Sequence, residues 1–174
     1  MGIFLSLLQA IGILVGAGWA FFRFRIESPA KPRIELDVDA EFMGPQAGQY
    51  IAGISIQVRN KGTVSHTIER LELDILGLKL DAPVLPHPNA DFAQRVNFPE
   101  KLFKSDNIIY DKYGYYFVRA GVQQTIYYHT AVPENIRFVR VWAAFHYRGV
   151  DKKHKHTVER IFEVGPAAGS ASRN

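Results

Sequence analysis

The sequence predicts an all-β protein, an antiparallel two-sheet sandwich preceded by one N-terminal transmembrane helix. Three observations lead to this prediction: an uncharged apolar run near the N-terminus, short segments of alternating apolar and polar residues, and turn-forming residues between them. The chain has 174 residues, of which 47% are hydrophobic, 22% are charged and none is cysteine. This composition excludes a disulfide scaffold and thiolate-bound zinc, and it argues against global disorder.

The apolar run extends from Gly2 to Phe22 without a charged side chain. As a helix it would be about 31 Å long, which matches a bilayer hydrocarbon core of roughly 30 Å. A cleaved signal peptide is the less favoured alternative, because no Lys or Arg precedes the run and the only cleavage site is weak. The N-terminus also fits a myristoylation pattern, which we attribute to chance. We interpret residues 1–25 as a signal anchor with juxtamembrane basic residues.

Basic residues follow the apolar run. Arg23, Arg25, Lys31 and Arg33 are opposed only by Glu27. The positive-inside rule therefore predicts a single-pass protein of the cell membrane, with its N-terminus outside and its β-domain in the cytoplasm. We expect these four basic side chains to contact the headgroups of an anionic lipid bilayer.

Small and polar residues form a stripe on the predicted helix. Gln9, Gly12 and Gly16 recur at spacings of three and four residues, so they share one face. A Gly-x-x-x-Gly pair allows two helix backbones to approach closely, which predicts a homo-oligomer formed through the membrane helix. The alternative is that glycine is common in membrane helices and has no special role here.

The β-domain is predicted over residues 33–164, after a linker at residues 26–33 whose two prolines prevent the helix from continuing. Residues 33–42 alternate strictly between apolar and polar side chains, as a half-buried strand does. Further strands are predicted over residues 50–59, 67–76, 123–131, 137–147 and 157–164. The tail at residues 165–174 is predicted to be disordered.

The stretch between residues 77 and 121 is less regular, because four prolines interrupt it. We expect loops, edge strands and a short helical turn near residues 98–103. Six or more short strands separated by turn signals are typical of a two-sheet sandwich, and a barrel is the main alternative.

One strand and its turn resemble a known family. The pattern comprises Ile54-x-Ile56-x-Val58-x-Asn60-x-Gly62, then a charged strand with Leu71, Leu73 and Ile75, and later a strand led by Gly121. It resembles immunoglobulin-like adhesion-type modules of the CARDB kind, which implies a non-catalytic interaction or spacer module. The chain departs from antibody domains by lacking their Cys–Trp–Cys core. It is also similar to small bacterial membrane proteins with one N-terminal helix and a β-rich cytoplasmic domain, some of which are effectors in phage defence.

The sequence contains no nucleophile elbow, phosphate-binding loop or zinc-protease motif, so we predict no enzyme and no cofactor. Glu35, Asp37, Asp39 and Glu41 form a row on one strand face. Such a row binds a divalent cation in some proteins. We favour a solvated face whose carboxylates pair with Lys or Arg across the strands, and we predict no metal.

A basic hairpin tip is predicted at residues 148–156. Its lysines, Lys152, Lys153 and Lys155, are candidate partner contacts, and they oppose metal binding by His154 and His156. The remaining histidines are scattered and define no catalytic triad. The two basic stretches account for more than the whole net charge of +4, so the rest of the chain is mildly acidic. A nucleic-acid partner is therefore not expected.

These observations favour a membrane-anchored β-sandwich that binds or localises a protein partner at the membrane. A membrane-perturbing effector that oligomerises through its transmembrane helix is the first alternative. The second alternative is a small-ligand receptor or enzyme that uses the aromatic cluster from Tyr110 to Phe117, although packing of these rings under a loop is the favoured interpretation.

Overall fold

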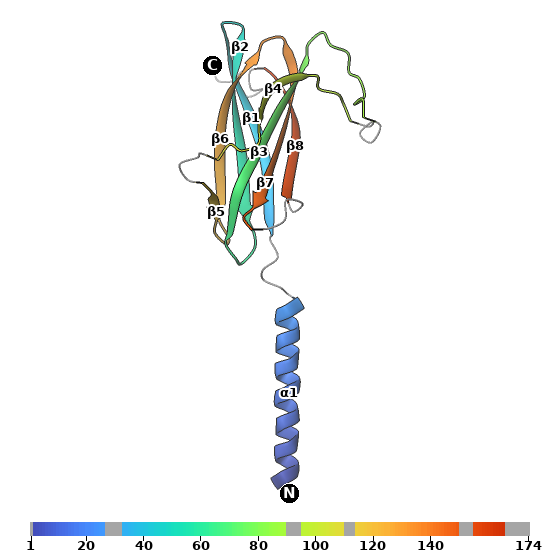
Figure 1. The fold of residues 1–174 in the computed structure, drawn as a ribbon, viewed down its shortest axis with the longest axis vertical. Coiled ribbons are helices and arrows are strands. Elements are labelled where there is room, and N and C mark those ends of the chain that lie inside the picture. Colours follow the sequence, from blue (N-terminus) through green and yellow to red (C-terminus); the bar gives the residue numbers. More distant parts are fainter. Residues whose placement is uncertain (1, 27–32, 90–94, 110–113, 150–154, 166–174) are drawn as a thin grey trace, which may run out of the picture.

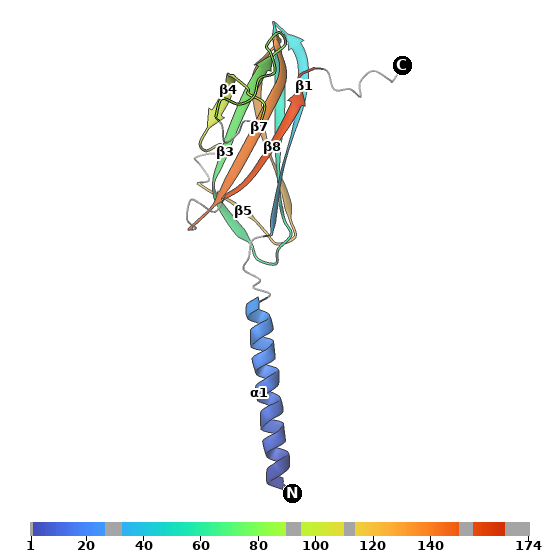
Figure 2. The ribbon, with the colours of Figure 1, turned by 90° about the vertical axis from the view of Figure 1, so that its right-hand side faces the viewer.

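The computed structural model of the chain describes residues 2–26, 33–89, 95–109, 114–149 and 155–165. It has one helix, α1 (Gly2–Ile26), which projects away from a β-domain (Figures 1 and 2). Among the described residues, no helix combines the length and the hydropathy that a membrane span requires. Most of the predicted linker and tail lies outside the described residues.

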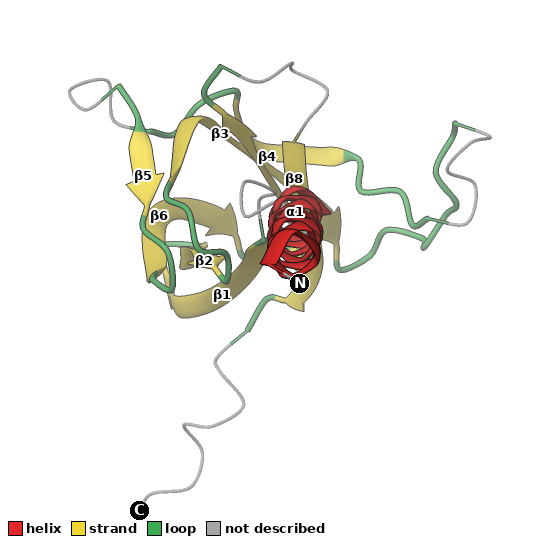
Figure 3. Cartoon of the chain, turned by 90° about the horizontal axis from the view of Figure 1, so that it is seen from below, coloured by secondary structure: helices red, strands yellow, loops and turns green. Residues whose placement is uncertain are grey.

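The β-domain consists of two antiparallel sheets. Its strands are β1 (Ile34–Gln46), β2 (Gln49–Asn60), β3 (His66–Lys79), β4 (Glu100–Ser105), β5 (Tyr116–Val118), β6 (Gln123–Pro133), β7 (Ile136–Tyr147) and β8 (Lys155–Glu163). One sheet has the order β1-β2-β6 and the other the order β4-β3-β7-β8, with β5 also paired to β3. Seen from below, the two sheets form opposite layers of a sandwich (Figure 3). The prediction of a two-sheet antiparallel sandwich is thus confirmed.

The core lies between the sheets and is built from the apolar side of each alternating strand. On β2, Ile54, Ile56 and Val58 are fully buried, while the residues between them are half-exposed. On β7, Val139, Val141 and Phe145 occupy the equivalent inner positions. The period of two in side-chain direction explains why the sequence pattern located these strands.

Two expectations from the sequence need correction. The prediction of a helical turn near residues 98–103 was wrong. Most of this segment forms β4, in which Phe103 pairs with Ile75 of β3. Pro99 is compatible with the first turn of a helix, but the pairing with β3 buries Leu102 and Phe103 partly against the core, and this tertiary contact decides the structure. The first strand was also too short, since β1 continues to Gln46 through Gly44, whose φ is 118°.

Several connections meet at the end of the sandwich where β1 begins, which we call the anchor end (Figure 1). Asn60 fastens these connections together and is fully buried. Its Nδ2 donates hydrogen bonds to the carbonyl oxygens of Val64 (2.8 Å) and Val118 (3.0 Å). Its Oδ1 accepts a hydrogen bond from the N–H of Gly62 at 2.9 Å. The Asn-x-Gly pattern therefore forms a turn, and its Asn60 side chain also links this turn to Val118 at the end of β5.

Candidate functional site

Helix α1 carries the first group of predicted site residues. Gln9, Gly12 and Gly16 lie on exposed positions of α1. An added Cβ at either glycine would meet nothing within 4 Å, so this stripe is open in the single chain. The stripe therefore lies on the exposed surface of α1, and its association with a second helix stays a prediction.

The predicted basic contacts fall partly within the described residues. Arg23 is exposed, and its guanidinium carbon lies 5.2 Å from the centroid of the Trp19 ring. Arg33 is exposed immediately before β1. Lys31, Lys152 and Lys153, and the side chain of Arg25, lie outside what the structure describes.

Lys155 requires a correction, because it belongs to β8 rather than to the hairpin tip. Its Nζ lies 5.1 Å from the centroid of the Trp142 ring and 4.0 Å from Oε2 of Glu72. These contacts place Lys155 beside a groove that the sequence did not predict.

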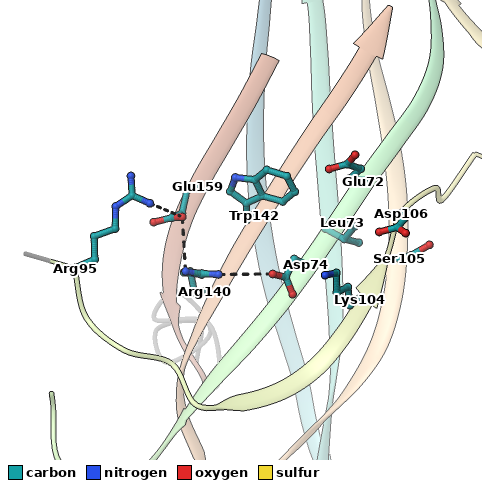
Figure 4. Close-up of a pocket in the computed structure, with 10 residues that line it drawn as sticks. All are labelled: Glu72, Leu73, Asp74, Arg95, Lys104, Ser105, Asp106, Arg140, Trp142 and Glu159. Atoms are coloured by element: carbon teal, nitrogen blue, oxygen red, sulfur yellow. Dashed lines mark ion pairs between the residues drawn. The ribbon is translucent and has the colours of Figure 1, made fainter. Parts of the chain in front are cut away.

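This groove, the charged groove, lies on the outer face of the β4-β3-β7-β8 sheet (Figure 4). It has a volume of about 320 Å³. Its lining is mostly charged and consists of Glu72, Leu73, Asp74, Arg95, Lys104, Ser105, Asp106, Arg140, Trp142 and Glu159. The sequence held one indication of this groove. Trp142 and Arg140 lie on the polar side of an alternating strand, where a tryptophan is unusual. These two residues of β7 did not reveal that side chains from β3, β4 and β8 would line the same groove.

Arg140 is the centre of the charged groove. Its side chain is only 16% exposed, and its guanidinium lies 3.7 Å from Asp74 and 4.0 Å from Glu159 (Figure 4). Glu159 also pairs with Arg95 at 3.7 Å. The Nε atom of Arg140 is buried and has no hydrogen-bond partner among the described residues. Arg140, Asp74, Glu159 and Arg95 are already engaged in ion pairs with one another. A charged ligand that bound to them would have to displace these pairs.

Glu72 is the centre of a second cluster of charged side chains on the outer face of the β4-β3-β7-β8 sheet. Its Oε1 lies 2.7 Å from Nε2 of His146 and 3.1 Å from Nη2 of Arg70. Hydrogen bonds to a carboxylate are stronger than neutral ones, so this cluster fixes the outer surface of β3 against β7. Within the described residues, no group of three or more His, Cys, Asp or Glu side chains could hold a metal ion.

The aromatic cluster at residues 110–117 forms a second hollow where it is described. Tyr115, Tyr116 and Phe117 line a groove of about 260 Å³ together with Gln124 of β6. We call it the aromatic groove. Among the described rings of this cluster, Tyr116 packs partly against the core, whereas Tyr115 and Phe117 are exposed and do not have the expected packing. Tyr110 and residues 111–113 lie outside the described residues.

Two arginines flank the aromatic groove. The guanidinium carbon of Arg148 lies 5.5 Å from the centroid of the Tyr115 ring, and that of Arg119 lies 5.7 Å from the centroid of the Phe117 ring. Cation–π contacts of this kind hold the guanidinium groups over the rings. The groove therefore combines an apolar wall with a positively charged rim.

The predicted carboxylate row on β1 is paired with basic residues. Asp37 lies 3.2 Å from Arg160 of β8, in the facing sheet, and Glu35 pairs with Lys61. Asp39 instead accepts the N–H of Ala40 at 2.9 Å. The preferred interpretation, a solvated face paired with Lys or Arg, is thus confirmed for Glu35 and Asp37.

Two histidines that are far apart in the sequence meet around Tyr147. The ring centroid of Tyr147 lies 5.4 Å from that of His66 and 5.6 Å from that of His156. His156 also stacks on Phe145 at 5.1 Å. Burial lowers the pKa of both histidines, and the nearby His66 lowers the pKa of His156 further. Burial also raises the pKa of Tyr147 to about 12.

These pKa shifts predict acid sensitivity. Because the folded-state pKa of both histidines lies below the ordinary value of about 6.5, the unfolded chain binds protons first as the pH falls. The contribution of these two histidines to the free energy of unfolding should therefore be fully present above their ordinary pKa of about 6.5 and should decrease as the pH falls below it. Urea unfolding of wild type and His156→Phe across this range checks the effect. The variant should show a shallower decrease, and an identical pH dependence would exclude His156 as a cause.

Comparisons with known proteins identify no family. No family model and no curated protein matches the chain. A structural-genomics target designated SoR45 has 10% identity and a TM-score of 0.47, over 81% of this chain and 92% of that one. A putative ApaA protein from Bordetella pertussis has 12% identity and a TM-score of 0.44, over 76% and 94%.

Proposed function

We propose that the protein is a membrane-tethered, non-catalytic β-sandwich module that binds or localises a protein partner at the membrane. The observation that carries this proposal is the exposure of large apolar side chains over most of the circumference of α1. Ile13, Leu14 and Val15 are 70%, 72% and 66% exposed. Consecutive helix residues point in directions about 100° apart, so these three side chains spread over more than half of the circumference of α1, beside the stripe of Gln9, Gly12 and Gly16.

Lipid is the environment that best satisfies such a helix. Covering one large aliphatic side chain is worth roughly 1.5–3 kcal/mol, and α1 exposes several of them. The sandwich does not cover α1, which projects away from it (Figure 1). We therefore propose that the lipid bilayer covers the apolar side of α1.

The charge of the anchor end supports the same proposal. β1 begins there, and the connections that follow Asn60, β5 and β7 also meet there. The described residues of this end include the exposed arginines Arg33, Arg119 and Arg148. Three exposed arginines from distant parts of the sequence thus share one end of the sandwich. Each basic residue close to an anionic membrane contributes about 1 kcal/mol of attraction.

The strand order supports an immunoglobulin-like topology, which we propose for the sandwich. β1, β2 and β6 form one sheet, while β3, β7 and β8 form the other with β4 at its edge. Consecutive strands therefore change sheet three times, from β2 to β3, from β5 to β6 and from β6 to β7, as they do in sandwiches with Greek-key connections. Domains of this architecture commonly act as interaction modules, so the topology agrees with a binding function by analogy alone.

Vesicle flotation tests the tether. Ile13→Asp combined with Leu14→Asp should reduce binding to vesicles of phosphatidylcholine and phosphatidylglycerol at least about 100-fold, because each aspartate costs about 2.5–3.5 kcal/mol in a membrane helix. The matched control, Ile51→Asp with Val84→Asp, changes exposed apolar residues of the sandwich and should float like wild type. Equal flotation of both variants would contradict the proposal.

The same vesicles distinguish the effector alternative. A tethered interaction module should leave an encapsulated dye in place. Leakage that Gly12→Ile with Gly16→Ile abolishes would instead favour a membrane-perturbing oligomer and contradict the proposed role.

A further inference from the structure

Strand β6 has an unpaired edge among the described strands. It pairs with β2 on one side, and no described strand pairs with its other side. From Gln123 to Pro133 it contains no charged residue, and Tyr127 near its middle is 69% exposed. An edge strand presents unpaired N–H and C=O groups, and proteins usually protect a long edge with charges or cover. β6 lacks the charges.

The edge strands β1 and β4 are protected. β1 carries four carboxylates and lies beside β8 of the facing sheet, to which Asp37 is bound through Arg160. β4 carries Lys101 and Lys104 within six residues. Charged side chains on an edge oppose the addition of another strand. The long edge of β6 lacks the charges that protect β1 and β4.

The aromatic groove lies beside the beginning of this edge. Gln124, the second residue of β6, contributes to the groove wall. Its Oε1 atom is buried and has no hydrogen-bond partner among the described residues. A buried acceptor without a donor is unfavourable, so a ligand N–H that reaches it gains a hydrogen bond at little further desolvation cost. The groove thus offers an apolar wall and an unused acceptor next to a strand edge.

The rim of the groove indicates the charge of the ligand. Arg119 and Arg148 lie over the rings of Phe117 and Tyr115, and no carboxylate of the described residues lies within 4.0 Å of either guanidinium. Arginine forms strong, directional hydrogen bonds with carboxylates. An acidic side chain next to the groove would complete this arrangement.

We propose that β6 and the aromatic groove bind an extended peptide segment of a partner protein. The segment adds a strand to the edge of β6, places an apolar side chain in the groove and directs an acidic side chain toward Arg119 and Arg148. This mode of recognition uses main-chain hydrogen bonds for affinity and side-chain pockets for specificity. The inference rests on the proposed function, because it identifies the partner of the interaction module. A second copy pairing through β6 fits less well, since β6 brings no carboxylate to the arginines.

A peptide library tests the inference on the full chain held in phosphatidylcholine nanodiscs. The probe is a display library of random peptides, each about as long as β6. We expect enrichment of sequences with alternating apolar residues and a flanking Asp or Glu. An enriched peptide, made synthetically, should protect β6 amides from hydrogen exchange.

Three variants make this test specific. Tyr127→Lys, which adds a charge to the edge, should weaken peptide binding at least about tenfold. Met43→Lys adds the same charge to β1, on the same face of the sheet, and should not affect binding. Arg119→Glu with Arg148→Glu should weaken binding of the acidic peptide and strengthen binding of its lysine counterpart.

The outcomes separate this inference from the tether. No enrichment, protection of a region other than β6, or equal binding by Tyr127→Lys would overturn the peptide site. Dimers that Tyr127→Lys dissociates, without enrichment of a peptide, would assign the edge to a second copy and also overturn it. If the double arginine variant loses only vesicle binding, the arginines contact lipid, and the peptide inference is wrong while the tether stands.

Discussion

Replacing Asn60 with leucine should lower the free energy of unfolding by about 3–5 kcal/mol. The substitution leaves the carbonyl groups of Val64 and Val118 and the N–H of Gly62 without their hydrogen-bond partner. The hydrogen bond to Val118 is buried, and those to Val64 and Gly62 are partly buried. A buried polar group left unpaired costs about 1–3 kcal/mol, and leucine regains part of this loss through its apolar surface. Urea unfolding followed by circular dichroism measures the change.

The neighbouring residue supplies the control for this prediction. Lys61 is half-exposed and forms a surface ion pair with Glu35, so Lys61→Leu should change stability by no more than about 1 kcal/mol. A loss at Asn60 of similar size to that at Lys61 would show that the buried hydrogen bonds do not fasten the anchor end.

Replacing Phe145 with alanine should destabilise the sandwich by about 3–5 kcal/mol. Phe145 is among the largest fully buried side chains, and its ring contacts those of Tyr147 and His156. The facing sheets cannot close over the cavity without moving these rings. Thermal or urea unfolding measures the loss.

Phe138 offers a matched comparison on the same strand. It lies on the outer side of β7, is partly exposed, and has Arg137 over its ring at 6.0 Å. Phe138→Ala should therefore cost clearly less than Phe145→Ala. Equal losses would contradict the assignment of the inner face of β7 to the core.

The strands were predictable because one side of most strands is buried and the other is solvated. The alternation from Ile34 to Phe42 is the direct consequence, and β1 has that burial pattern. β4 was not predictable, because it exists only through its pairing with β3, and its own sequence has no turn signal apart from Pro99. The length of β1 depended on the backbone conformation of Gly44, which has a positive φ. The alternation of apolar and polar residues does not reveal this conformation.

The candidate sites depended on contacts between distant residues. The Asn-x-Gly turn was visible in the sequence, but the hydrogen bond from Asn60 to Val118 joins residues 58 positions apart. The aromatic cluster was also visible, whereas its position beside Gln124 and the edge of β6 follows from the topology. Arg140 and Glu159 are ordinary charged residues until β7 and β8 pair and place them in one groove.

Tryptophan fluorescence tests the membrane tether most directly, because the chain has only 2 tryptophans, Trp19 in α1 and Trp142 in the charged groove. In Trp142→Phe, the remaining Trp19 reports on the helix; in Trp19→Phe, Trp142 reports on the sandwich. Vesicles containing brominated phosphatidylcholine should quench Trp19 strongly, and more so with bromine near the headgroup than near the end of the acyl chain, while Trp142 stays unquenched. If Trp19 is no more quenched than Trp142, α1 is not embedded in lipid and the account of a membrane-tethered module is wrong.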